Sequence, residues 1–214
     1  MTIYITDKDH PASTLKYGLY TIVDTEFTSW QGSLSRNWSL PTEYREIVNI
    51  GLLRVSFEPT QIRVERGLDL YIKPVFSPIL SNYFISLTGI TQASLEDSPD
   101  FKHAWTTAAN FIGDSKPISN GNDGQIIREN MYLHGLVYDS FYTVNIRSIL
   151  MHGLEISDKD CISAELSAYL PDSYCPSQST NLRGHTGLSD CYSLASALSF
   201  IHSKNALAST DATI

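Results

Sequence analysis

The sequence predicts an α/β protein in which helices flank a mixed five-stranded sheet. Three runs rich in β-forming residues come first, and segments with helical and strand periodicity alternate after them. Of the 214 residues, 42% are hydrophobic and 18% are charged, which excludes a disordered chain. We expect residues 1–214 to form a single domain, with a core at about 18–203 and a frayed tail at 204–214.

The first three strands are expected to form an antiparallel meander. Residues 18–27 (GLYTIVDTEF) are mostly apolar and rich in β-forming residues, which predicts a buried strand. Residues 46–57 and 61–72 predict two further strands, joined by a turn at 58–60. Residues 29–41 are polar and contain proline, glycine and two tryptophans, so we expect an excursion or mobile loop there.

The second half of the chain is expected to alternate helices and strands. Residues 101–112 have apolar side chains at helical spacing, and residues 116–120 predict a short strand. The remaining elements are a helix at 124–136, a strand at 141–147, a helix at 160–170, a loop at 171–184 and a closing helix at 188–203.

Charge and cysteine content exclude several classes of protein. The net charge of −8 argues against a broad basic surface for nucleic acid, but not against an enzyme that holds metal with carboxylates. Three cysteines without CxxC spacing predict reduced thiols rather than disulfides or a structural zinc site. The N-terminal residues do not resemble a signal peptide, and no apolar run approaches the roughly 20 residues that cross a membrane. We therefore expect a cytoplasmic protein without a membrane partner.

Two acidic residues end the most apolar segment of the chain. Asp24 and Glu26 lie two positions apart in a predicted strand, so both carboxylates lie on the same face. Neighbouring negative charges raise each other's pKa unless a cation or a hydrogen-bond donor neutralises them. Many such pairs are solvated strand ends, but a position at the exit of a central strand favours a functional pair.

Two later segments contain further candidates. Asp123 lies between a short strand and a helix, where it is either a catalytic carboxylate or an ordinary helix N-cap. Between His185 and Asp190 a continuous helix would turn by about 500°, so they converge only if His185 lies on a loop before the helix of Asp190. Gly184 and Gly187 favour that loop; the alternative is a surface histidine and a capping carboxylate.

The combined order, Asp-x-Glu, then Asp, then His-x4-Asp, resembles the DEDDh family of 3′-5′ exonucleases, the DnaQ-like or RNase T-like group of the ribonuclease H-like superfamily. The segments EIVNIGLL, YFISLTGIT and VNIR resemble its enhanced-RNAi and histone-mRNA 3′-end exonuclease branch. The resemblance covers residues 20–201. It implies a ribonuclease H-like mixed five-stranded sheet flanked by helices.

The resemblance implies a two-metal-ion hydrolase acting on phosphodiester bonds. The implied metal ligands are the four carboxylates of Asp24, Glu26, Asp123 and Asp190. Such oxygen ligands favour two Mg²⁺ or Mn²⁺ ions over zinc. Asp24 would bridge the ions, and His185 would be the general base that deprotonates the attacking water. The implied substrate is the 3′ end of single-stranded RNA or DNA, and the product is a nucleoside 5′-monophosphate.

The resemblance also implies a nucleotide-binding surface, formed by Phe27, Thr28, Tyr83, Leu87, Thr88, Asn122 and His185. If residues 81–87 are helical, Tyr83 and Leu87 share a face and would sandwich the terminal base, although core packing would explain the same spacing. Asn122 departs from an aromatic residue common in this branch. Asn49 departs from an acidic residue common in the second strand, outside the metal site.

Two other functions fit the same residues. One is a nucleic-acid-binding protein on this fold with little catalytic activity, and the other is a phosphodiesterase of short or cyclic oligonucleotides. The presence of all five catalytic positions favours the exonuclease over both.

Overall fold

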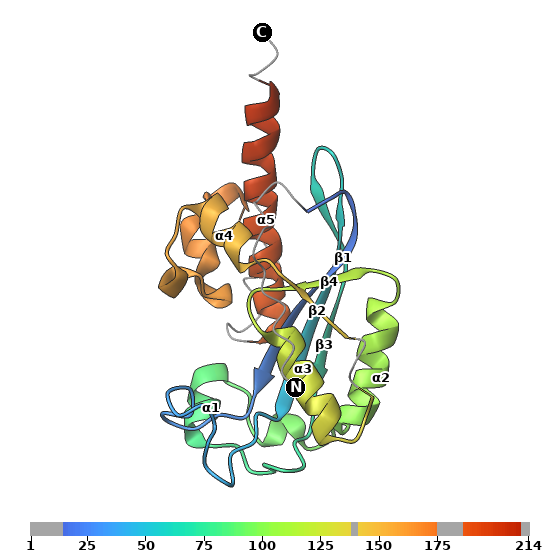
Figure 1. The fold of residues 1–214 in the computed structure, drawn as a ribbon, viewed down its shortest axis with the longest axis vertical. Coiled ribbons are helices and arrows are strands. Elements are labelled where there is room, and N and C mark those ends of the chain that lie inside the picture. Colours follow the sequence, from blue (N-terminus) through green and yellow to red (C-terminus); the bar gives the residue numbers. More distant parts are fainter. Residues whose placement is uncertain (1–14, 138–140, 175–185, 211–214) are drawn as a thin grey trace.

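A five-stranded sheet forms the centre of the molecule (Figure 1). The computed structural model describes residues 15–137, 141–174 and 186–210. The strands are β1 (Gly18–Phe27), β2 (Ile47–Phe57), β3 (Ile62–Tyr71), β4 (Lys116–Ser119) and β5 (Val144–Asn145), in the spatial order β3-β2-β1-β4-β5. β1, β2 and β3 pair antiparallel, whereas β4 pairs parallel with both β1 and β5. The predicted meander, the mixed sheet and the central position of β1 are confirmed.

Helices lie on both faces of the sheet. The α-helices are α1 (Asn82–Thr88), α2 (Phe101–Ile112), α3 (Asp123–Leu133), α4 (Arg147–Leu154) and α5 (Gly187–Thr210). Short 3-10 segments are η2 (Ala93–Leu95), η3 (Asp158–Asp160), η4 (Ser163–Tyr169) and η5 (Asp172–Tyr174).

The two faces of β1 are buried by different helices. Ile22 belongs to a core cluster with residues of α4 and α5, whereas Val23 belongs to a second cluster with residues of α2 and α3. Burial on both faces explains the continuous apolar run of this strand. Because side chains alternate along a strand, Asp24 and Glu26 lie on the face of Ile22, which α5 covers.

The segment after β4 differs from the prediction. Instead of a strand at 141–147, only two residues form β5, because the Asn145 side chain accepts the Arg147 N–H at 2.9 Å and α4 begins there. The sequence prediction contains no helix at this place. Its apolar residues Ile146, Ile149 and Leu150 nevertheless have helical spacing, and all three are buried.

The prediction of a helix at 160–170 is wrong. This segment contains the end of η3 and the 3-10 segment η4 instead. Side chains three residues apart lie above one another in a 3-10 helix, so Ser163 and Leu166 share a side. Leu166 packs into the cluster that includes α5, and this contact turns Ser163 toward the sheet.

The closing helix is longer than predicted. α5 continues to Thr210, so residues 204–210 are helical rather than a frayed tail. Figure 1 shows its C-terminal turns extending away from the sheet. That the whole chain forms a single domain stays a prediction.

The described part of the chain has no helix with the length and apolar character that crossing a membrane requires. Cys161 and Cys191 are buried free thiols. Cys175 lies outside the described residues.

Candidate active site

An acidic cluster lies where β1 ends and α5 begins. Asp24 and Glu26 extend from one face of β1, and Asp190 lies in the first turn of α5. One carboxylate oxygen from each of these residues lies within 4.8 Å of the other two. The structure thus brings together three of the four predicted metal ligands.

The fourth predicted ligand, Asp123, lies beside this cluster at the start of α3. Its carboxylate accepts the Thr25 N–H at 3.0 Å and the Thr25 hydroxyl at 2.7 Å. The N-cap position belongs to Asn122, whose side chain makes no capping hydrogen bond. Asp123 therefore connects α3 to β1 between the two strand carboxylates, and the helix-cap interpretation of this residue is wrong.

Burial and neighbouring charge shift the pKa values of the carboxylates in this site. Burial, followed by the charges of the neighbouring carboxylates, raises the pKa of Asp24 and of Glu26 well above their ordinary values. Burial also raises the pKa of Asp123 to about 6, against the opposing effect of its hydrogen bonds from Thr25. Such repulsion is relieved when a cation binds, and an all-oxygen donor set suits Mg²⁺ or Mn²⁺. The residues present therefore fit a divalent metal site.

Sequence reasoning missed Ser163. Its hydroxyl lies near the Asp24 carboxylate and lowers the pKa of that group, opposing the larger effect of burial. The side-chain N–H of Asn120, just after β4, donates to the same hydroxyl at 3.1 Å. No motif marks Ser163, because its position depends on the 3-10 turns of η4.

His185, the predicted general base, lies outside the residues that the structure describes. Thr186, the first residue after that gap, accepts the Asp190 N–H through its carbonyl oxygen at 3.0 Å. Asp190 itself occupies the helical position that the prediction requires.

α1 presents two of the predicted nucleotide-binding side chains to solvent. Tyr83 is 43% exposed and Leu87 is 46% exposed, so the core-packing interpretation of this pair is wrong. The neighbouring side of the helix, about 100° around its axis, is buried through Phe84 and Thr88. The Thr88 hydroxyl donates to the Phe84 carbonyl oxygen and accepts the Ile90 N–H, both within this segment.

The segment after β1 is fastened to the body of the molecule by Trp38. Its ring packs against Phe27 with centroids 5.5 Å apart, and its indole N–H donates to the Thr28 carbonyl oxygen at 2.9 Å. The Thr28 N–H donates to the Glu46 carbonyl oxygen, also at 2.9 Å. Both backbone groups of Thr28 thus have partners within the chain, and direct binding of nucleotide by Phe27 and Thr28 stays a prediction.

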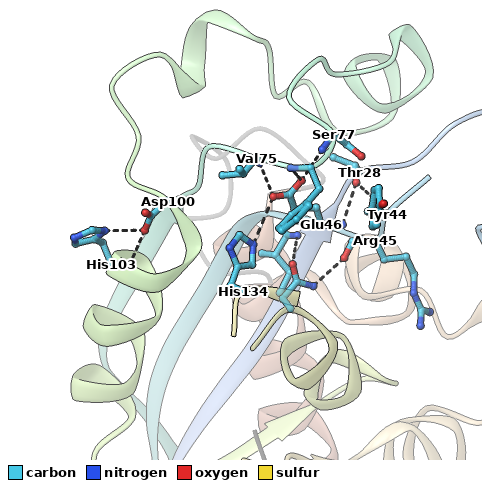
Figure 2. Close-up of polar contacts among 12 residues, drawn as sticks. Thr28, Tyr44, Arg45, Glu46, Val75, Ser77, Asp100, His103 and His134 are labelled. Atoms are coloured by element: carbon cyan, nitrogen blue, oxygen red, sulfur yellow. Dashed lines mark hydrogen bonds and ion pairs between the residues drawn. The ribbon is translucent and has the colours of Figure 1, made fainter. Parts of the chain in front are cut away.

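A buried carboxylate joins this segment to the approach to α1, as Figure 2 shows. Glu46 accepts the N–H groups of Val75, Phe76 and Ser77 at 2.5–2.8 Å, and Nε2 of His134 lies 3.5 Å from it. Burial lowers the pKa of His134, against the opposing effect of the Glu46 charge. The hydrogen bonds of Glu46 therefore fix the position of the end of β1 relative to the segment that carries α1.

The chain matches a known protein family. A family model described as Exonuclease (RNase_T) matches residues 21–198, which include every predicted catalytic position. No curated protein sequence matches the chain.

The fold is similar to those of solved nucleases. The nuclease domain of 3′hExo, a DEDDh family member bound to rAMP, has a TM-score of 0.68 at 20% identity, covering 85% of this chain and 90% of that one. A 3′-exonuclease that recognises the histone mRNA stem-loop has a TM-score of 0.70 at 17% identity, covering 92% and 67%. Cell-death related nuclease 4 has a TM-score of 0.66 at 18% identity, covering 86% and 63%, so this chain spans less than two thirds of it. These similarities confirm the predicted ribonuclease H-like fold.

Proposed function

Since the chain belongs to the RNase T-like family of DEDDh-type exonucleases, we propose that it removes nucleotides from the 3′ end of single-stranded RNA or DNA and releases nucleoside 5′-monophosphates. The observation that carries this proposal is the cluster of Asp24, Glu26 and Asp190 within 4.8 Å, with Asp123 beside it. Buried carboxylates that raise one another's pKa need a cation, and a phosphodiester is a substrate on which such a cation acts.

The cofactor in this proposal is a pair of Mg²⁺ or Mn²⁺ ions. Bound ions would supply electrostatic stabilisation of the negative charge that develops on the phosphate oxygens. Asp24, on which the charges of Asp123, Asp190 and Glu26 all act, is the proposed shared ligand. Asp123, already hydrogen-bonded by Thr25, completes the site directly or through water.

His185 is the proposed general base. It precedes Asp190 by five residues, and its imidazole would accept the proton of the attacking water near neutral pH. Asp190 itself belongs to the acidic cluster.

Tyr83 and Leu87 are the proposed contacts of the terminal base. Their exposure on one side of α1 leaves an aromatic ring free to stack, and stacking on a ring tolerates any base. The net charge of −8 gives little attraction for long nucleic acid, so we expect weak binding away from the 3′ end.

Digestion of single-stranded oligonucleotides labelled at either end tests the proposed function. With Mn²⁺, a 3′ label should be released at once as mononucleotide, whereas a 5′ label should remain on a ladder of shortening products. A chelator should stop both reactions. Release of the 5′ label first, cleavage of cyclic oligonucleotides alone, or binding without cleavage would contradict the proposal. RNA, DNA and a stem-loop compared side by side identify the preferred substrate.

Tyr83→Ala should weaken binding of a nucleoside monophosphate by about 1–3 kcal/mol, because a base would lose its stacking partner. Titration of the folded variant measures this change. The matched control is Tyr17→Ala, which removes another exposed tyrosine just before β1, at the end of the strand away from the acidic cluster. Equal affinities of the two variants would show that Tyr83 does not bind the base.

A further inference from the structure

The first residues of α5 lie directly against β2. A Cβ atom added to Gly51 would lie 1.9 Å from the Gly187 carbonyl carbon and 2.1 Å from the Leu188 nitrogen. Gly51 pairs with Asp24 in the sheet, so α5 begins on the strand next to the acidic cluster. The absence of a side chain at residue 51 permits this close approach.

The side chain of Asn49 joins the start of α5 to the sheet. Asn49 is fully buried, and its Oδ1 accepts the Gly187 N–H at 2.8 Å. This N–H belongs to the first turn of the helix, where backbone donors have no partner within the helix. Asn49, which belongs to β2, therefore caps the N-terminus of α5, as a residue directly before the helix would otherwise do.

Asp69 fixes the orientation of the Asn49 amide. Its carboxylate accepts an Nδ2 hydrogen at 2.7 Å, and the Leu70 carbonyl oxygen accepts from Nδ2 at 3.2 Å. With two acceptors on the nitrogen side, only the orientation that presents Oδ1 to Gly187 satisfies all the groups. An acidic residue at position 49 would instead face a second carboxylate.

We propose that Asn49, oriented by Asp69, is a positioning residue that fixes the first turn of α5 and thereby places Asp190 against Asp24 and Glu26. Asn49 pairs with Glu26 across the sheet, and Gly51 pairs with both Asp24 and Asp69, so the hydrogen bonds lie beside the carboxylates that they align. The inference rests on the proposed function, because its consequence is metal affinity.

Asn49→Leu removes the link while keeping a side chain of similar size. We expect Mn²⁺ affinity, measured by calorimetry, to fall about 10–100-fold, and turnover to fall similarly, as for other groups that orient metal ligands. The matched control is Thr21→Val, which removes a buried hydroxyl pair with Ser115 from β1 but does not touch α5. This control should lose stability and retain Mn²⁺ affinity.

The exchange Asn49→Asp with Asp69→Asn tests orientation rather than packing. Asn49→Asp alone places two carboxylates together and should weaken Mn²⁺ binding. The double variant restores one amide and one carboxylate, with an acceptor toward Gly187, and should recover to within about threefold of wild type.

Three results would overturn the inference. If Asn49→Leu binds Mn²⁺ as tightly as Thr21→Val does, the link does not position Asp190. If the double variant is no better than Asn49→Asp, orientation by Asp69 is wrong. In both cases, cleavage by the wild-type protein leaves the proposed function intact. A wild-type protein that neither binds Mn²⁺ nor cleaves oligonucleotides overturns the proposed function and this inference together.

Discussion

Asp24→Asn is expected to abolish hydrolysis while leaving the protein folded. The charges of Asp123, Asp190 and Glu26 all act on Asp24, so the loss of its charge removes the ligand that both ions would share in the proposed site. Metal stabilisation of a phosphoryl transition state amounts to several kcal/mol, so we expect turnover to fall by at least about 10³-fold. Single-turnover cleavage of a labelled oligonucleotide with Mn²⁺ measures the effect, and circular dichroism checks the fold.

The same substitution should stabilise the metal-free protein at neutral pH. Burial, and then the neighbouring carboxylates, raise the pKa of Asp24 well above its ordinary value of 3.8. An acid whose pKa is higher in the folded state than in the unfolded state binds more protons when folded, so stability falls as pH rises above the unfolded value. Metal-free wild type should therefore lose stability from about pH 4 toward neutrality, and Asp24→Asn should lose less.

The control for both effects is Asp97→Asn, which removes an exposed carboxylate outside the cluster. It should retain activity and follow the wild-type dependence of stability on pH. Thermal unfolding in chelator across this pH range, with and without added Mn²⁺, separates the variants. A folded Asp24→Asn protein with full activity would refute the metal site. An unfolding temperature of the wild-type protein that does not change when Mn²⁺ is added would refute it as well.

Much of the fold could be predicted because its strands and helices carry strong local signals. β1 and α2 begin and end at the predicted residues, since an apolar run and a helical apolar pattern mark them clearly. The spacing of Asp24 and Glu26 within β1 predicts their common face in the same way. Asp190 could be placed because two glycines, Gly184 before the helix and Gly187 at its first residue, mark where that helix begins.

Other parts of the site depend on tertiary contacts that no local pattern encodes. α4 was missed because Ile146 suits a strand as well as a helix, and the choice is made by the hydrogen bond from Arg147 to Asn145. Ser163 lies near Asp24 at the start of a 3-10 segment in which Leu166 is buried. The prediction set Asn49 outside the metal site, and nothing near it in sequence indicates its bond to a helix 138 residues away.

Gly51→Ala is expected to destabilise the protein strongly. The added methyl carbon would lie 1.9–2.3 Å from backbone atoms of Gly187 and Leu188, closer than any non-bonded contact permits. Backbone cannot rotate away as a side chain can, so α5 must move. Inserting a carbon into a packed interior costs about 1–3 kcal/mol and occasionally more, and for this site we expect about 3 kcal/mol. Because Asp190 moves with α5, Mn²⁺ affinity and cleavage should fall with stability.

Gly67→Ala is the matched control, since it makes the same substitution on the neighbouring strand β3. A Cβ atom there would meet the Leu188 Cδ1 methyl at 3.0 Å, the end of a flexible side chain that can shift. The gain in strand preference and the loss of unfolded-state freedom offset that small clash, so stability should change by less than about 1 kcal/mol. Urea unfolding and Mn²⁺ titration of both variants make the comparison. If Gly51→Ala matched Gly67→Ala in stability and in Mn²⁺ affinity, the close packing of α5 against β2 would be wrong. The explanation of how Asp190 comes close to the strand carboxylates would then be wrong as well.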